Sequence, residues 1–212
     1  SDLELIILGG HVFDKLGLKN IKLHINSLGD KNDKNKYADI VTKFFKSIKS
    51  KLDDYQLNTL NKNPLRLLDS KKDNIKDILE KIPTMTETLS NESKTRFNIL
   101  LDKLDVIGID YILDNSIVRG LDYYNDTVFE WRDMSLGSQN AVCAGGRYDS
   151  LVQNTGGNDV PAIGFAMGIE RIVELIKNIN ISFDEQQFII PIISTLAETK
   201  SYGVELATSL RH

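Results

Sequence analysis

The stretch "IVRGLDYYNDTVFEW", residues 117–131, combines strand-forming residues with charged groups and two adjacent phenols. Phe129 and Trp131 recur at the two-residue period of a half-buried strand. Neighbours on a regular strand point to opposite faces, so Tyr123 and Tyr124 cannot both serve one face of it. The pair follows a glycine at the entry to the strand, where the backbone need not be regular. We therefore expect one phenol to reach a ligand while the other supports it.

The composition is that of an ordinary globular protein. Of 212 residues, 41% are hydrophobic and 26% are charged, and the net charge is −4, which excludes a surface that is basic throughout. The single cysteine, Cys143, cannot form an intramolecular disulfide. No apolar run is long enough for a membrane span and no leader pattern occurs, so we expect a cytoplasmic protein without membrane contact. Because the chain opens on Ser1 without Met and stops inside a helical pattern, we expect a fragment of something larger.

Around the opening stretch, residues 108–180 show strand patterns separated by glycine turns. A short strand "AVCA" (141–144) leads into the turn "GGRYD", and Asp149 is placed to cap the helix that follows. The segment "PAIGFAMGIERIVELIKNI" (161–179) predicts a buried strand followed by an amphipathic helix. The inward positions of that helix are expected to be Ile169, Ile172, Val173 and Ile176.

The first part of the chain predicts one helix and one strand. Apolar residues recur at helical spacing over residues 2–16, and Gly17 is suited to end the helix. Residues 21–26 alternate between apolar and polar side chains, which predicts a half-buried strand. His24 falls on the polar face of this strand, where we expect a solvated histidine.

Residues 30–105 differ from both flanks because they predict helices rich in Lys, Asp and Asn. The segment "NKYADIVTKFFKSIKSKL" carries one apolar stripe, and Lys43, Lys46 and Lys49 fall largely off it. We interpret the region as a compact helical module inserted between β-rich segments. Its lysines form either a solvated helix face or a contact for a polyanion.

The end of the chain predicts the start of another domain. A continuous apolar strand over residues 186–194 is followed by a helical pattern over residues 198–212. A strand and a helix after a polar loop indicate a separate α/β domain that begins near Glu185.

Several common catalytic patterns are absent from the sequence. There is no G-x-x-x-x-G-K-[ST] loop, no G-x-G-x-x-G fingerprint and no G-x-S-x-G elbow. With three histidines and one cysteine, no zinc spacing occurs, and we identify no metal site made of side chains. The sequence therefore excludes the usual nucleotide cradles and the common serine hydrolase arrangement.

What remains is a group of polar residues beside glycines at the expected strand ends. Arginine suits polyphosphate because it is always charged and presents two donors as a fork. A tyrosine hydroxyl both donates and accepts, which suits recognition of a small polar ligand. The group indicates a small-molecule site with an anionic component. Its members are Arg119, Asp122, Tyr123, Tyr124, Glu130, Arg147, Tyr148, Asp149, Glu170 and Arg171.

Three segments together resemble histidyl-tRNA synthetase, a class II aminoacyl-tRNA synthetase: "VRGLDYYNDTVFEW", "CAGGRYDSLV" and "GFAMGIERI". The first is close to unique to histidyl enzymes and their paralogues, and the third is the general class II motif 3. "INSLGD" and "NPLRLLDSK" resemble the same family in the same order. The resemblance covers nearly the whole chain.

The resemblance implies an α+β fold with a mixed, mainly antiparallel sheet and flanking helices. Residues 1–29 and 106–180 would form the later part of the catalytic domain. Residues 30–105 would be the inserted helical domain that approaches the tRNA acceptor stem, and residues 186–212 the start of the anticodon-binding domain. The family joins histidine to tRNA(His) as a homodimer, through histidyl-adenylate formed from ATP with Mg²⁺.

The resemblance also assigns roles to individual residues. Arg119 matches the histidine-specific arginine, which would neutralise charge on the α-phosphate and also touch the substrate carboxylate. Tyr123, Tyr124 and Tyr148 match histidine-binding positions, with Tyr124 expected to reach the imidazole. Arg171 matches the motif 3 arginine that holds the γ-phosphate of ATP. Three glycines would allow backbone and ligand to pack closely; they are Gly145, Gly146 and Gly164.

The chain also departs from the family pattern. Asn125 and Asp126 stand where many members have Thr–Gly, a change that we expect to be tolerated. Motifs 1 and 2 are missing, and with them another ATP-binding arginine and part of the histidine pocket. The alternative is the paralogue that serves as a regulatory subunit of ATP phosphoribosyltransferase. Arg119 and Arg171, the full insertion and the strand at residues 188–193 argue against that alternative.

Overall fold

The computed structural model describes residues 1–69, 79, 81–117, 123–179, 196 and 199–209. The chain divides into two compact units, Ser1–Ile179 and Asn180–His212. The second unit contains helix α9 (Lys200–Ser209), where the sequence predicts a helix. The strand expected over residues 186–194 lies outside the described residues.

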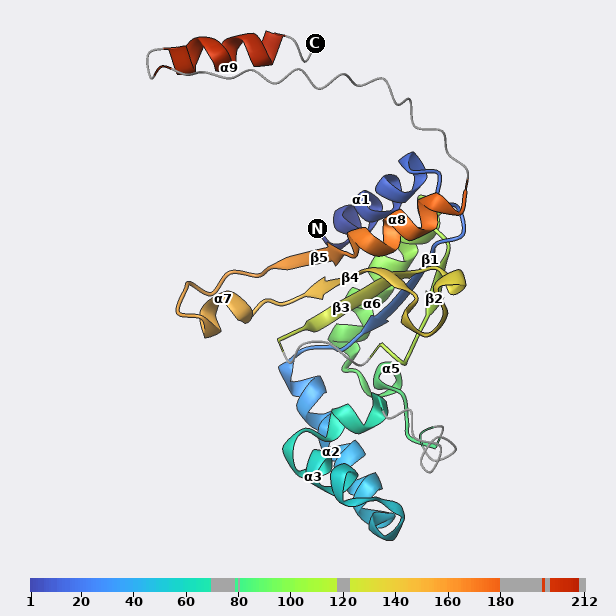
Figure 1. Ribbon diagram of the computed structural model, residues 1–212. Coiled ribbons are helices and arrows are strands. Elements are labelled where there is room, and N and C mark those ends of the chain that lie inside the picture. Colours follow the sequence, from blue (N-terminus) through green and yellow to red (C-terminus); the bar gives the residue numbers. More distant parts are fainter. Residues whose placement is uncertain (70–78, 80, 118–122, 180–195, 197–198, 210–212) are drawn as a thin grey trace. The chain divides into compact units, whose positions relative to one another are not determined.

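A twisted sheet forms the centre of the first unit (Figure 1). Strands β1 and β2 are parallel, and the other neighbouring strands are antiparallel. The expected mixed, mainly antiparallel sheet is therefore confirmed. Within the described residues its spatial order is β2 (Tyr111–Leu113), β1 (Lys22–Ser27), β3 (Asn125–Arg132), β4 (Ala141–Arg147) and β5 (Ile163–Met167).

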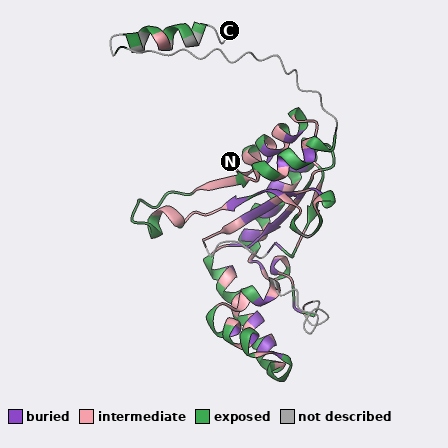
Figure 2. Ribbon diagram, viewed as in Figure 1, coloured by how far each residue is buried: buried purple, intermediate pink, exposed green. Residues whose placement is uncertain are grey.

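Three helices share a core with one face of this sheet: α1 (Asp2–Lys15), α6 (Asn91–Val106) and α8 (Ile169–Lys177). Strand alternation directs Phe129 and Trp131 into this core, where both side chains are buried. A Cβ atom at Gly9 would lie 2.9 Å from Nε1 of Trp131, so glycine in the middle of α1 makes room for the indole ring. The opening stretch therefore supplies the centre of the core, which Figure 2 shows as buried strands.

The buried face of α8 differs from the prediction. Ile172 and Leu175 are buried, whereas Ile169 is 63% exposed and Val173 is 43% exposed. An α-helix turns by about 100° per residue, so Ile172 and Leu175 lie on the same side of α8. Ile169 and Val173 point away from this side, which is the one that packs on the sheet. The prediction was wrong at Ile169 and Val173 because an apolar pattern alone does not say which arc of the helix meets the sheet.

The region from Lys31 to Thr88 builds a second hydrophobic core of its own. Tyr37, Val41 and Phe45 of α2 are buried there, which confirms the predicted apolar stripe, and the lysines off the stripe are exposed. Helix α6, expected in the same module, packs instead in the core of the sheet. The described elements of this region are α2 (Lys31–Ser47), η1 (Lys49–Lys51), α3 (Asp54–Lys62), η2 (Pro64–Asp69) and α5 (Met85–Thr88).

His24 is not the solvated side chain that the strand pattern predicts. Only 13% of its side chain is exposed, and its Nδ1 lies 2.9 Å from Oδ2 of Asp114. Nη1 of Arg132 donates to the same carboxylate oxygen over 2.6 Å. A charged cluster therefore covers the polar face of β1, because Asp114 follows β2 and Arg132 ends β3, the two strands that flank it.

Candidate active site

Three tyrosine rings meet where β3 begins and β4 ends. The ring centroids of Tyr123 and Tyr124 are 4.8 Å apart, and Tyr148 lies 5.8 and 6.1 Å from them respectively. Both members of the adjacent pair precede β3, so the alternation of a regular strand does not constrain them. The structure thus brings together all three tyrosines that the sequence singles out, and we call them the tyrosine cluster.

Glycines form the floor beneath two of these rings. Gly146 and Gly164 are paired across β4 and β5. A Cβ atom at Gly164 would lie 2.6 Å from the hydroxyl oxygen of Tyr148, and one at Gly146 would lie 3.1 Å from Cδ1 of Tyr124. A larger residue at either position would require the ring above it to shift. These glycines therefore admit the protein's own tyrosines, and a close approach by a ligand stays a prediction.

Gly145 has a different role because it alternates with Gly146 and faces the helices. Its added Cβ atom would lie 2.5 Å from the carbonyl oxygen of Gly164 and 2.6 Å from Cβ of Phe165. It would also lie 2.9 Å from Cζ of Phe129. The residue is thus needed for close packing between strands and within the core.

Within the tyrosine cluster, Tyr124 presents a neutral hydroxyl group at physiological pH. Burial, with a smaller contribution from neighbouring Tyr123, raises the pKa of Tyr124 to about 12. A neutral phenol can donate one hydrogen bond and also accept one. The arrangement is therefore suited to recognising a small ring that has both donor and acceptor atoms, as imidazole has.

Two of the sequence candidates, Arg119 and Asp122, lie outside the described residues. Ile117, which precedes them, is buried with Leu28 and Val128, and Tyr124 packs against this group. The chain on either side is thus anchored beside the tyrosine cluster. The role of Arg119 stays a prediction.

Arg171 lies in the first turn of α8 and is held at the start of β4. Its Nη1 donates to the carbonyl oxygen of Ala141, and its Nη2 donates to Oε1 of Gln139 over 3.1 Å. Tyr148 follows the other end of the same strand, six to seven residues away, which corresponds to about 20 Å. The structure therefore places Arg171 and the tyrosine cluster at opposite ends of β4.

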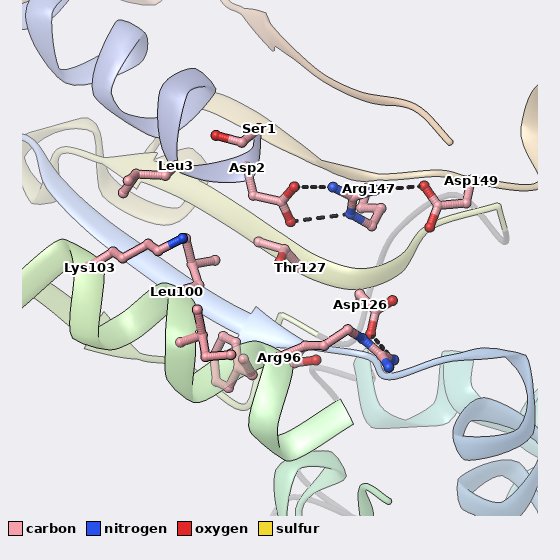
Figure 3. A pocket seen from close by; sticks show the side chains of 13 residues that line it. Ser1, Asp2, Leu3, Arg96, Leu100, Lys103, Asp126, Thr127, Arg147 and Asp149 are labelled. Carbon is pink, nitrogen blue, oxygen red and sulfur yellow. Dashed lines mark hydrogen bonds and ion pairs between the residues drawn. The ribbon is translucent and has the colours of Figure 1, made fainter. Parts of the chain in front are cut away.

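A second polar site lies on the side of the sheet that carries the helices (Figure 3). Here a cavity of about 530 Å³ is lined by the start of α1, by α6 and by β3 and β4. Arg147 points at the carboxylate of Asp2, to which its Nε donates over 3.2 Å and its Nη2 also donates. Its Nη1 donates to Oδ1 of Asp149 over 2.9 Å. Arg147 thus ties the first turn of α1 to the end of β4.

The ion pair between Asp2 and Arg147 holds both groups charged. Burial acts to raise the pKa of Asp2, but hydrogen bonds from Arg147 and Thr127 outweigh it, and the pKa lies below its usual value. The pKa of Arg147 is raised, chiefly by its hydrogen bond to Asp2. Sequence reasoning chose Arg147 as a ligand candidate and missed Asp2, since no local pattern links residues that are 145 positions apart.

Asp149 does not cap the helix that follows it, which corrects the prediction. The N-cap of α7 (Leu151–Asn154) is Ser150, without a side-chain hydrogen bond. The carboxylate of Asp149 instead accepts from Arg147, from Nδ2 of Asn125 over 3.0 Å and from the backbone N–H of Ala162. A charged partner and two amide donors hold the side chain away from the helix.

In the described part of the chain, no three His, Cys, Asp or Glu side chains are arranged as metal ligands. No helix in that part has both the length and the apolar character needed to span a membrane.

The chain is similar in sequence to proteins of one family. Residues 2–172 match the family model described as "Histidyl-tRNA synthetase". The "Histidine--tRNA ligase" of Buchnera aphidicola subsp. Schizaphis graminum is 46% identical over 213 residues, which are 100% of this chain and 50% of that protein. The protein of the same name from Hydrogenovibrio crunogenus is 41% identical over 210 residues, covering 99% of this chain and 49% of that protein.

A solved structure agrees with the sequence matches. The crystal structure of apo S. aureus histidyl-tRNA synthetase superposes with a TM-score of 0.71 at 30% identity, covering 100% of this chain and 52% of that one. This chain spans about half the length of the curated relatives that it matches. The sequence match over most of the chain, together with the shared fold, shows that the chain belongs to the histidyl-tRNA synthetase family.

Proposed function

We propose that this chain takes part in joining histidine to tRNA(His), as part of a histidine–tRNA ligase that uses ATP. The observation that carries the proposal is the tyrosine cluster on its glycine floor. The relatives named above carry the ligase name, so the alternative of a regulatory subunit has less support. The homodimer and a cytoplasmic location belong to the same proposal.

In this proposal the tyrosine cluster selects the amino acid. Tyr124 contacts the imidazole, and Tyr123 and Tyr148 pack around it. A substrate without polar ring atoms would leave a buried hydroxyl unpaired, which costs about 1–3 kcal/mol. The neutral state of the Tyr124 hydroxyl supports this role, because it can pair with either ring nitrogen.

The phosphates would bind toward the other end of β4. Arg171 would hold the γ-phosphate, and Arg119 would stabilise charge that develops on the α-phosphate. The separation of about 20 Å along β4 suits a ligand pair with an amino acid at one end and a triphosphate at the other. Mg²⁺ would accompany ATP, since this ion is usually held by substrate phosphates, waters and one or two carboxylates.

The remaining assignments are proposals of the same kind. The region from Lys31 to Thr88, which has its own core, would be the inserted domain, and its exposed lysines would approach tRNA. Residues 186–212 would begin the anticodon-binding domain. We expect the 212 residues alone not to form adenylate, because motif 2 lies outside them.

A chimera tests the function. In the chimera, the 212 residues of this chain replace the matching segment of the Buchnera relative. The assay measures histidine-dependent exchange between ATP and pyrophosphate. We expect exchange by the chimera and none by the chain alone. We also expect Tyr124→Phe to raise the KM for histidine about tenfold with little change for ATP, from the loss of one hydrogen bond.

Tyr55→Phe is the matched control, since this tyrosine is 71% exposed on α3, outside the tyrosine cluster. It should leave both KM values unchanged. A folded chimera without exchange activity would refute the proposed function. An equal effect of Tyr124→Phe on both substrates would refute the proposed role of this tyrosine.

A further inference from the structure

Two cations, one from helix α2 of the inserted region (Lys31–Thr88) and one from helix α6 that follows it, contact the chain at the end of the tyrosine pair. Nζ of Lys34, in α2, donates to the backbone carbonyl of Tyr124 over 2.8 Å. Nη2 of Arg96, in α6, donates to Oδ1 of Asp126 over 2.9 Å, as Figure 3 shows. Neither cation is near Tyr124 in sequence, and both act on the same three-residue segment, 124–126.

This segment has a backbone conformation that needs support. Asp126 has a φ of +46°, in the left-handed region that side-chain-bearing residues rarely adopt. Its backbone N–H donates to the carbonyl of Gly29, and its carbonyl accepts from the N–H of Leu28, each over 2.7 Å. The pairing of β3 with β4 is irregular between Asn125 and Val128. Regular sheet pairing is therefore interrupted directly after Asn125, and contacts from outside the strand pair hold the backbone there.

Arg96 is itself positioned through a buried carboxylate. Asp33 is 4% exposed and joins the starts of α2 and α6. Its Oδ1 accepts from the N–H of Ser90 over 2.8 Å, and its Oδ2 accepts from the hydroxyl of Ser93 over 2.6 Å. Nη2 of Arg96 donates in turn to the oxygen of Ser93 over 2.9 Å. One hydrogen-bonded network therefore connects the helix starts to Asp126.

We propose that Lys34 and Arg96 are positioning residues that hold Tyr124 in place for histidine, so that the inserted region and the amino-acid pocket are coupled through segment 124–126. The proposal rests on the proposed function of the tyrosine cluster. Neither side chain acts on a reacting atom. Any shift of α2 relative to the sheet is transmitted to the carbonyl of Tyr124, because this carbonyl is held from α2.

The first test uses the chimera and variants in which a long neutral side chain replaces a charged one. Lys34→Met and Arg96→Met should each raise the KM for histidine about five- to tenfold, with the KM for ATP and kcat changed less than about twofold. Lys43→Met is the matched control, since this lysine lies exposed on the same helix α2. The exchange assay contains no tRNA, so changes in tRNA binding cannot contribute to these KM values.

A double-mutant cycle tests whether Arg96 acts through Asp126. Asparagine tolerates the left-handed region, so Asp126→Asn removes the charge with little backbone penalty. The double variant Arg96→Met, Asp126→Asn should be no worse than the poorer single variant, and Arg96→Lys should restore most of the affinity. Additive effects, or equal effects on histidine and ATP, would overturn the proposal.

A second readout keeps the inference separate from the proposed function. In the 212-residue chain labelled with ¹³C-tyrosine, Tyr124→Phe identifies the ring signals of Tyr124. Lys34→Met and Arg96→Met should shift these signals while the thermal midpoint changes little, and Lys43→Met should not shift them. Unmoved signals would refute the positioning role even if exchange is observed. Shifted signals would support it even if the chimera lacks exchange, which would refute only the proposed function.

Discussion

The replacement of Gly145 by alanine tests whether the sheet depends on close contact between β4 and β5. The added Cβ atom would lie 2.5 Å from the carbonyl oxygen of Gly164 and 2.6 Å from Cβ of Phe165. Neither of these atoms can move by rotating a side chain, so the two strands must separate locally. Overpacking of this kind costs about 1–3 kcal/mol, and the two rigid contacts place Gly145→Ala near 3 kcal/mol.

For a unit of this size, about 3 kcal/mol corresponds to a fall in the thermal midpoint of about 6–12 °C. This fall in the thermal midpoint can be measured by circular dichroism melting of the 212-residue chain. Gly164→Ala should cost less, since its nearest contact, at 2.6 Å, is the mobile hydroxyl of Tyr148. Gly168→Ala is the control, with nothing closer than 3.4 Å to its Cβ atom. A midpoint for Gly145→Ala within 2 °C of the unmodified chain would refute the reasoning.

Two further predictions concern Asp33 and Cys143. Burial acts to raise the pKa of Asp33, but hydrogen bonds from Ser93, Ser90 and Asp30 outweigh it and lower the pKa. The stabilisation is therefore complete above the unfolded pKa of about 3.9 and is lost as the pH falls through the lower folded value. Asp33→Asn should lower the free energy of unfolding by about 2–4 kcal/mol at pH 7. Denaturant titrations should show that this difference becomes smaller below about pH 4. A difference that does not change with pH would contradict the role of the Asp33 carboxylate. Burial raises the pKa of Cys143 to about 12. Its thiol should therefore resist iodoacetamide at pH 8 until denaturant unfolds the chain. Rapid labelling of the folded chain would contradict the burial of this residue.

Local patterns predicted the secondary structure well. The helix expected over residues 2–16 is observed at Asp2–Lys15, and the strand expected over residues 21–26 at Lys22–Ser27. These elements depend on contacts within a few residues, such as the capping box between Asp30 and Asp33 at the start of α2. Such contacts join residues that are close in sequence, so their spacing indicates them where no other partner competes for the side chain.

The predictions that failed concern side chains with distant partners. His24 was expected in solvent, but Asp114, 90 residues away, binds it. Asp149 was expected to cap a helix, but Arg147 and Asn125 hold it instead. In each case the local pattern allowed one arrangement, and a partner that the sheet brings close, Asp114 for His24 and Asn125 for Asp149, competed with it.

The candidate site shows the same division. The sequence by itself determined the adjacent tyrosines, the glycine-rich strand after them and the resemblance to a synthetase, because these are properties of contiguous residues. Only the tertiary structure decided that Lys34 and Arg96 hold the segment beside the tyrosine pair. The physical reason is that strand order and register bring remote residues within hydrogen-bond distance, and neither is encoded in any single stretch of the chain.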